Sequence, residues 1–587
     1  MEDSNKNKPY KPFSTNFRAR LASAEALPQL AALGLAAGLV TGLVILGFRA
    51  LIEVPLTHLL PGQDSENFQG LSRHWHFLLP LGGAFLVGLI LQQLRPSERR
   101  VGVVHVLERL SLHQGRLPGR NAVIQFITGV LALITGQSGG REGPAIHLGA
   151  ATSSLIGQWL RLPNNSLRTL VACGVAAAIA ASFNTPMAGV IFAMEVVMME
   201  YRMRSFIPVI IAAVTATLLT QLVYGPDAAF AVPQFTLGSL SEIPMVAAAG
   251  VLIGALAALF ISLVRICASQ HQRPVWLRML IAGLVTGCAA LVTPAVLGIG
   301  YDSVNAAMLN QMAISALFAL AAMKLIASAV SIGLGMPVGL IGPTLVIGAA
   351  FGGLVGELAS RVFDTHADAG FYVMLGMAAM MAATLQAPLA ALVAVLELTG
   401  NPNIILPAML IIVIATLVTS DLFRQRSIYL SALAAAGLEY PPNAVTRELQ
   451  NAGVTSVMNT DLITLPPTVD LQTAQWALER QPQWLLIKID NAARSALLPQ
   501  DLQLFLDEHI MPDTSRHQEA IDLERLPGAR LDLAAIAAEA TLHEALQLLE
   551  TTGIEALCVC DTGPGQVIRH LGLITRSDID NYLRSTH

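Results

Sequence analysis

The chain has 587 residues, of which 54% are hydrophobic and 13% charged, and its mean hydropathy is +0.59. Water-soluble globular proteins carry about 25% charged residues, so this composition excludes a chain that is soluble throughout. The charges are also unevenly placed: 20 lie between positions 121 and 420, whereas the segment from 441 to 587 holds 20 acids and 10 bases. We therefore predict a membrane block followed by an acidic soluble region, which does not suit nucleic acid as a partner.

The N-terminal segment joins basic residues to a long apolar run. Lys6, Lys8 and Lys11 precede the run from Leu27 to Leu51, which is too long for the apolar region of a signal peptide. We expect a first membrane helix preceded by a basic cytoplasmic tail, residues 1–27.

Further apolar stretches follow in chain order, and several are too short to cross a membrane. They lie at 76–94, 121–135, 145–160, 168–182, 186–199, 205–223, 244–266, 276–298, 312–334, 343–360, 370–384, 387–398 and 403–420. A membrane-crossing helix needs about 20 apolar residues, and the short stretches are interrupted at Gly and Pro. Broken helices at membrane depth require protein or a water-filled cavity to satisfy their backbone groups. This pattern favours a buried transport site over a receptor stalk.

The membrane block contains an internal repeat. The segment Gly140–Ala150 aligns with Gly339–Ala349 at an offset of 199 residues, and Pro186–Glu195 aligns with Pro388–Glu397 at an offset of 202. Recurrence of Gly, Ala and Pro through membrane composition alone is the alternative. We interpret the block, residues 28–437, as two homologous halves of about 28–225 and 240–437 with a binding site between them. The residues alone leave open whether the halves are inverted.

The region after Arg426 is polar and holds a second, weaker duplication. Residues 438–453, with Pro441 to Asn443, are predicted to form a linker. Two copies follow at 454–512 and 526–587, each with strand and helix signals that alternate and each closing on a strand and a helix. Alternation of this kind predicts a paired α/β module.

The segment Gly139 to Pro144 (GGREGP) is typical of a loop that feeds a helix N-terminus inside the membrane. Free amide groups at such an end carry partial positive charge and bind anions. Gly335 to Pro343 offers a second terminus, and Gly174 with Ser182 to Pro186 a third. We expect these ends to form an anion site without a buried full cation, which would hold the ion too tightly for transit.

Charged residues near these helix ends have either a structural or a functional role. Glu142 either complements the helix dipole or competes with the anion when ionised and leaves when protonated. For Arg141 the structural interpretation, in which it pairs with a carbonyl or an acid, is favoured. Glu195 and Glu397 stand at equivalent positions of the two halves and are predicted to be structural acids that bond backbone at helix ends.

The segments GREGP, the later GxxGP, FNTPMAGVIFAME and SIYLSAL resemble the CLC family of chloride channels and proton-coupled chloride exchangers, and the tail resembles a CBS pair. The resemblance implies an all-α polytopic membrane protein with two inverted halves and re-entrant helices, followed by the α/β pair. It further implies a homodimer in a bacterial inner membrane, both termini cytoplasmic, with one anion pathway per subunit. By position, Glu142 resembles the gating glutamate and Tyr429 the inner-gate tyrosine. The remaining anion-binding positions carried over are Val101, Gly102, Arg141, Gly143, Leu340 and Ile341.

This sequence departs from the family pattern at three positions. Val101 stands where the family usually has a serine that coordinates the anion, and Ile341 stands where it has phenylalanine. The internal proton-transfer glutamate of the exchangers is here Val196, which cannot carry a proton. The membrane block thus resembles the channel-like branch, with a relay through water or Glu200 as the alternative.

The second α/β copy carries a possible nucleotide site. Thr575 and Asp578 match the CBS signature that holds a ribose, and Arg576 is placed to meet phosphate. The alternative is a dimerisation module without a ligand. The five cysteines (Cys173, Cys267, Cys288, Cys558 and Cys560) have no CxxC or Cys/His ligand spacing, so neither a disulfide framework nor a metal site is expected.

A passive, voltage-gated-type chloride channel is therefore the leading prediction, and a proton-coupled chloride antiporter is the alternative. No enzymatic activity is expected, chloride is the expected substrate, and the one cofactor considered is an adenine nucleotide at the CBS-like pair. The chain lacks a GxxxxGK[ST] phosphate loop, so an ATP-driven pump is not expected. A divalent-cation channel would need several carboxylates facing the pore. A receptor that senses nucleotides without transport would need unbroken spans.

Overall fold

The structure of the chain is a computed structural model that describes residues 27–586 except for 202, 227–229, 231–241, 364–368, 436, 439–443, 490–491, 510–519 and 563–567. It divides into two compact units. The membrane unit comprises Leu30–Trp159 and Arg168–Pro441, and the C-terminal unit comprises Met1–Gln29, Leu160–Leu167 and Pro442–His587. The predicted tail up to Ala26 and the Pro441–Asn443 part of the linker lie outside the described residues.

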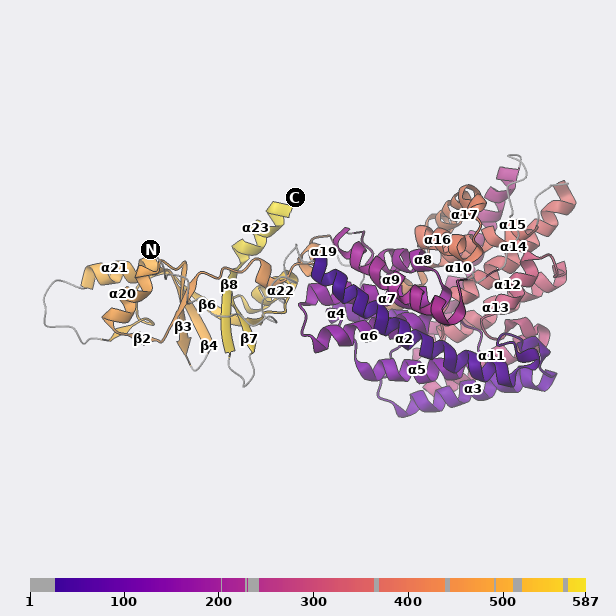
Figure 1. Ribbon diagram of the computed structural model, residues 1–587, viewed down its shortest axis with the longest axis horizontal. Helices are drawn as coiled ribbons and strands as arrows, with labels where there is room; N and C mark the ends of the chain where they lie inside the picture. The colour runs from indigo at the N-terminus through magenta and orange to yellow at the C-terminus, as the bar shows by residue number, and fades with distance from the viewer. Residues whose placement is uncertain are drawn as a thin grey trace. The chain divides into compact units, whose positions relative to one another are not determined.

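The membrane unit consists of helices, many of them short or broken (Figure 1). Nine helices among the described residues are long and apolar enough to cross a membrane. The elements are α2 (Leu27–Leu59), α3 (Arg73–Gln93), α4 (Gly102–Leu112), α5 (Gly119–Ile134), α6 (Glu142–Trp159), α7 (Asn164–Phe183), α8 (Pro186–Phe192), η3 (Ala193–Met198), α9 (Met203–Tyr224), α10 (Ile243–Ala268), α11 (Val275–Val292), α12 (Tyr301–Met308), α13 (Ile314–Gly333), α14 (Ile341–Phe363), α15 (Ala369–Leu385), α16 (Pro388–Thr399), α17 (Ile405–Leu417), η8 (Val418–Leu422) and α18 (Ile428–Ala435).

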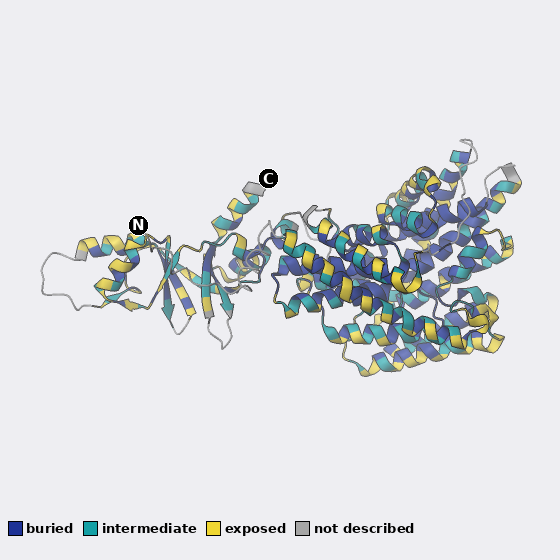
Figure 2. Cartoon of the chain, viewed as in Figure 1, coloured by how far each residue is buried: buried dark blue, intermediate teal, exposed yellow. Residues whose placement is uncertain are grey.

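Sequence-predicted stretches correspond to most of these helices, and the mostly helical architecture is confirmed. Helices α4, α12 and α18 were missed because they are short, and α4 carries Glu108 and Arg109 inside it. Outer helices such as α3 alternate buried and exposed faces (Figure 2). Their exposed apolar side chains, Leu43 and Leu222 among them, suit contact with lipid rather than water.

Glycines repeat the same helix packing in both halves of the membrane unit. The carbonyl of Gly174 on α7 lies where a Cβ of Gly149 on α6 would stand, and Gly149 blocks Gly174 in return. Gly348 on α14 and Gly376 on α15 form the same reciprocal contact, at the 199- and 202-residue offsets of the sequence repeat. Only glycine lets backbones approach this closely.

Reciprocal carboxylates join the two halves in opposite directions. Glu195 follows α8 and accepts from the N-terminal amides of Leu389 and Ala390 on α16 at 3.3 and 2.7 Å. At the end of α16, Glu397 accepts from the N-terminal amides of Met187 and Ala188 on α8 at 2.9 and 2.7 Å. Each helix therefore ends at the start of the other, which is the arrangement of an inverted repeat.

The C-terminal unit contains two copies of one α/β motif. Its main sheet has the order β1-β3-β4-β6-β7-β8, and in each copy the first pairing is parallel and the second antiparallel. Copy 1 is β1 (Leu462–Leu465), β2 (Thr468–Val469), α20 (Leu471–Glu479), β3 (Trp484–Ile489), β4 (Ala492–Leu497) and α21 (Pro499–His509). Copy 2 is β6 (Arg530–Ala537), α22 (Leu542–Thr552), β7 (Ala556–Thr562), β8 (Ile568–Thr575) and α23 (Arg576–Thr586), with β5 (Ile521–Asp522) paired to β2 before it.

The start of this unit differs from the predicted boundary at Val454. Helix α19 (Ala444–Gln450) lies within the predicted linker, and its Leu449 packs into the buried cluster that also holds Ile574 and Ile579. The linker prediction rested on polar composition, which does not distinguish a loop from a short helix with one apolar face.

Candidate functional site

The two glycine-proline loops meet at the centre of the membrane unit. The amide of Gly140 donates to the carbonyl of Gly339 at 2.8 Å, and the amide of Gly339 donates to the carbonyl of Gly140 at 2.6 Å. A Cβ on Gly143 would lie 2.8 Å from the Gly339 Cα, so the backbones touch. The N-termini of α6 and α14 are thereby held together. The first amides of both helices lack intrahelical acceptors and present partial positive charge.

The Glu142 side chain folds back over these joined termini. It is fully buried, and its two carboxylate oxygens have no hydrogen-bond partner among the described residues. A Cβ on Gly342 would lie 2.9 Å from Oε1, and Gly140 and Gly339 leave no room for a Cβ beside Oε2. A Cβ on Gly339 would lie 2.4 Å from Oε2 and 2.5 Å from the Gly143 nitrogen, so this oxygen is close to the first amides of α6. The carboxylate therefore lies where the helix ends would attract a free anion.

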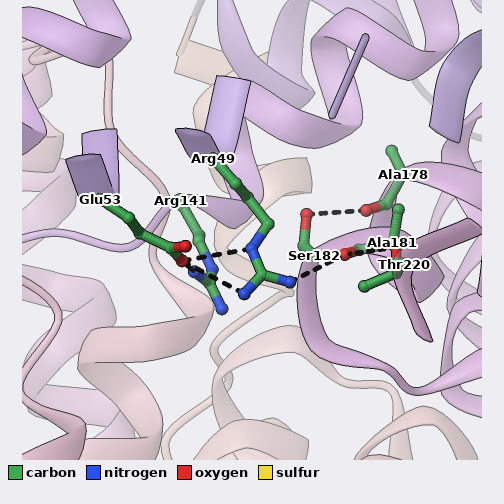
Figure 3. A network of polar contacts seen from close by, with 7 residues as sticks. All are labelled: Arg49, Glu53, Arg141, Ala178, Ala181, Ser182 and Thr220. Carbon is green, nitrogen blue, oxygen red and sulfur yellow. Dashed lines mark hydrogen bonds and ion pairs between the residues drawn. The ribbon is translucent and has the colours of Figure 1, made fainter. Parts of the chain in front are cut away.

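The Arg141 side chain lies in a polar network with Glu53 and Arg49 (Figure 3). Its Nη1 lies 2.8 Å from Glu53 Oε1 on α2, and Arg49 on the same helix donates to that oxygen at 3.2 Å. The guanidinium also stands 5.1 Å from the centroid of the Phe183 ring. Arg141 thus has the acidic partner that we predicted, and Glu53 offsets its charge. Sequence reasoning missed Glu53 because one acid inside the first helix carries no periodic signal.

Lys324 is a buried basic residue of the membrane unit that the sequence analysis does not include in the site. Its side chain on α13 is fully buried, and Nζ donates to the carbonyls of Val296 and Gly298 at 2.9 and 2.8 Å. These two contacts provide acceptors for two of the three N–H donors of the lysine side chain. The sequence signal that could have identified Lys324 is its position as a single lysine within the apolar stretch 312–334.

At the predicted third helix end, the N-terminus of α8, a carboxylate already bonds the amides. The N-terminus of α4 is a different helix end without a side-chain cap. The N-terminal amides of α8 are bonded to Glu397, and Ser182 donates inside α7 to the Ala178 carbonyl at 2.7 Å. Gly174 lies within α7. The α8 terminus therefore has no free amides for an anion.

Helix α4 begins after Val101, whose side chain makes no capping hydrogen bond. Gly102 has φ +78° and open space around its missing Cβ, a conformation that disfavours other residues. Helix α18 packs against α4. It holds Tyr429, buried with 4% exposure and within electrostatic range of Glu142. Leu340 and Ile341 are buried at the start of α14.

The missing relay position lies in an apolar setting. Val196 is buried in the π-helical turn η3, and Glu200 follows that turn with its amide bonded to the Met194 carbonyl at 3.1 Å. A cavity lies between α7, α8, α14 and α16, and Thr185 and Tyr301 are the polar residues among those that line it. Tyr301, which the sequence did not indicate, has a buried hydroxyl without a partner among the described residues.

The possible nucleotide residues of copy 2 bond to one another. Asp578 Oδ2 accepts from the Thr575 amide at 2.8 Å and from its hydroxyl at 2.7 Å, and the Asp578 amide donates to Thr575 Oγ1 at 3.3 Å. This is a capping arrangement at the start of α23. Arg576 is exposed, 3.8 Å from Glu550. Nucleotide binding stays a prediction.

Comparison with known proteins places these features in a family. A family profile described as "Voltage gated chloride channel" matches residues 83–420, and a CBS domain profile matches residues 529–585. The "Putative chloride channel protein ClcB-like" of Ralstonia nicotianae is 32% identical over 365 residues, which cover 61% of this chain and 85% of the relative. The "Voltage-gated ClC-type chloride channel ClcB" of Escherichia coli is 30% identical over 404 residues, which cover 67% and 96%.

Solved structures share the fold. One titled as a slow cyanobacterial Cl⁻/H⁺ antiporter superposes with a TM-score of 0.61 and 23% identity, and the match covers 70% of this chain and 98% of that one. Another, titled as a eukaryotic CLC transporter, has a TM-score of 0.57 and 21% identity and covers 95% and 99%. At these identities the likeness establishes architecture alone.

Proposed function

Because the chain belongs to the CLC family of chloride channels and transporters, we propose that it is a passive anion channel gated by Glu142. The observation that carries the proposal is the position of the Glu142 carboxylate, buried over the joined N-termini of α6 and α14. The same electrostatic field that holds this carboxylate suits chloride.

Gating follows from competition for one site. While the carboxylate is ionised it occupies the helix ends, and its negative charge excludes an anion. Protonation removes that charge, the side chain leaves, and an anion takes its place beside the amides. The Glu53 carboxylate offsets much of the Arg141 charge, so the ion is attracted by the helix ends without being trapped.

The channel reading rests on the absence of a titratable group at position 196. An exchanger must carry protons between the cytoplasm and Glu142, and a buried valine cannot do so. The cavity between α7, α8, α14 and α16 has a mainly apolar lining, and Val196 is not among its lining residues. The second candidate function is a proton-coupled antiporter whose relay runs through Glu200 or water.

Flux through purified full-length protein in liposomes separates these functions. A chloride gradient should drive anions with few or no protons, and the reversal potential should follow the chloride gradient alone. A fixed ratio of protons to anions would overturn the channel proposal. Val196→Glu places a carboxylate at the missing position, at a cost of about 3 kcal/mol for a charge within the membrane, and Val196→Gln is its uncharged control.

Anion choice is a separate part of the proposal. Val101 provides no hydroxyl at the start of α4, so we propose weak discrimination between chloride and nitrate. Val101→Ser restores the hydroxyl, and Val101→Thr does so while nearly preserving the side-chain shape. Both variants should raise the chloride-to-nitrate flux ratio. An unchanged ratio in both would show that this helix end does not select the ion.

Assembly and placement complete the proposal. We propose a homodimer in the bacterial inner membrane with both termini in the cytoplasm and one anion pathway per subunit. Light scattering of the detergent-solubilised chain should give two copies per particle, and a monomer would contradict it. Proteolysis of inside-out vesicles should remove the C-terminal unit, whereas protection there would reverse the orientation.

A further inference from the structure

A cluster of two cysteines and one histidine lies in the β7–β8 hairpin of copy 2. Cys558 and Cys560 are two residues apart on β7, so their side chains share one face of the sheet. His570 on β8 stands directly across from Cys560. The side chains therefore converge from two strands, and Cys558 is buried while the other two are half-buried.

The three ligand atoms are spaced as around a single metal ion. Nδ1 of His570 lies 3.3 Å from Cys558 Sγ and 3.5 Å from Cys560 Sγ, and the two sulfurs are 3.8 Å apart. Tetrahedral zinc, with Zn–S near 2.3 Å and Zn–N near 2.0 Å, sets its ligands about 3.8 Å apart for two sulfurs and about 3.5 Å apart for sulfur and nitrogen. We propose that Cys558, Cys560 and His570 bind one zinc ion, with the fourth position open to water or an added ligand.

A β-bulge brings the third ligand into place. The pairing of β7 with β8 shifts register between Val559 and Cys560, and a bulge of this kind redirects a side chain toward its neighbour. Copy 1 has the same register shift between Ile487 and Lys488. The bulge is thus part of the motif, and copy 2 differs by carrying ligands beside it.

Copy 1 provides an internal contrast. Matching the paired registers puts Leu486, Lys488 and Ala493 in place of Cys558, Cys560 and His570. These residues offer an apolar chain, an ammonium and a methyl group, none of which binds zinc as a neutral or anionic donor would. The same backbone therefore has a ligand set in one copy only.

The chemistry of the set is specific. Two thiolates and one imidazole favour a borderline-soft ion such as Zn²⁺ over Mg²⁺ or Ca²⁺, which prefer oxygen ligands. Nε2 of His570 is buried without a hydrogen-bond partner among the described residues. Nδ1 of the same ring faces both sulfurs, which is the side on which a metal ion would bind.

The sequence predicts no metal site here because Cys558, Cys560 and His570 have neither CxxC nor Cys/His ligand spacing. The C-x-C pair and a histidine ten residues after Cys560 become a ligand set only once the hairpin register is known. The site is independent of the anion pathway, since it lies wholly within the C-terminal unit.

The test is zinc binding by the full-length, tag-free chain, purified in detergent with a reductant and stripped with a chelator. Titration with Zn²⁺ alone should give one bound ion per chain, and Co²⁺ should produce the thiolate charge-transfer and tetrahedral visible bands. Cys560→Ser and His570→Gln should each weaken zinc binding by at least about 100-fold, as expected for loss of a direct ligand. Cys288→Ser removes the exposed cysteine of α11 and should leave binding unchanged.

Three outcomes would overturn the proposal. The first is less than one zinc per chain at micromolar metal, and the second is equal binding by wild type and by both ligand variants. The third is a Cys558–Cys560 disulfide that persists in the protein as isolated, found by non-reducing mass spectrometry, with no zinc uptake after reduction. Circular dichroism and the elution volume of each variant establish that it is folded, so loss of binding is attributable to the ligand.

Discussion

The two halves of the membrane unit carry the same glycine-proline loop, but only the first loop ends in an acid. Position by position, Arg141 and Glu142 at the start of α6 correspond to Leu340 and Ile341 at the start of α14. Backbone hydrogen bonds between Gly140 and Gly339 join the two loops. In contrast, Glu195 and Glu397 are both glutamates at equivalent positions of the two halves, and they make equivalent contacts.

This contrast separates architecture from activity. Positions that are identical in both halves hold helices together: the glycine pairs of α6–α7 and α14–α15, and the reciprocal glutamates. Positions that differ are where the charge lies, at Arg141 and Glu142 in the first half and at Lys324 in the second. A symmetric frame thus supports an asymmetric site.

The largest effect is expected for Glu142→Gln, which removes the charge that competes with the anion. Anion flux should rise at neutral pH and lose most of its pH dependence, while wild-type flux increases on acidification. Ile341→Gln is the matched control, because it puts the same side chain at the equivalent end of the other half. Liposome efflux between pH 5 and 8 measures both. A wild-type pH profile in Glu142→Gln would remove the gate hypothesis.

A second asymmetric feature is Tyr429, whose buried phenol lies within electrostatic range of Glu142. Tyr429→Phe deletes only the hydroxyl and should weaken chloride binding in calorimetry by about fivefold, the value of one hydrogen bond of about 1 kcal/mol. Tyr429→Ala should weaken binding further and raise flux. Unchanged chloride binding in Tyr429→Phe would contradict a hydrogen bond from the hydroxyl to the anion and would indicate that Tyr429 contributes packing alone.

The symmetric acids should behave as a pair. Glu195→Gln and Glu397→Gln each weaken two hydrogen bonds at a helix N-terminus, so each should lower the free energy of unfolding by about 1–2 kcal/mol. Thermal unfolding in detergent should show similar losses for both, with the pH dependence of flux retained. Glu357→Gln, which loses only a half-exposed ion pair with Arg361, is the control. Strongly unequal losses would argue against equivalent roles.

The smallest effect is expected at the loop between α2 and α3. Burial, together with the Asp302 carboxylate, raises the pKa of Glu66 to about 7. Glu66 lines a pocket with Arg49, Glu53 and Arg141, so above pH 7 its charge opposes entry of anions. Glu66→Gln should raise flux at pH 8 by about twofold and change it little at pH 5.5, since a charge roughly 10 Å away in water acts with about 0.4 kcal/mol. An equal change at both pH values would contradict a titration effect.

The sequence predicted features that depend on local composition or on repetition. Apolar stretches marked most helices, the 199-residue offset marked the halves, and glycine beside proline marked the helix ends at Glu142 and Ile341. Partners brought together from distant positions were not predictable. Glu53 meets Arg141 across 88 residues, and only the hairpin register places His570 beside Cys560. The prediction of an anion site at the end of α8 was wrong, because the amides there are bonded to Glu397. That residue lies 210 positions after Met187, so the local sequence does not reveal it.

The crossed glutamates also order the events of biosynthesis. The amide of Met187 has no Glu397 acceptor until the ribosome has added a further 210 residues. At roughly 5–20 residues per second this delay is about 10–40 s. During that interval the first half stands in the bilayer with two amides of α8 and the Glu195 carboxylate lacking the groups that later bond them. The nascent first half is therefore an unfinished intermediate that depends on water, lipid headgroups or the insertion machinery until the second half arrives.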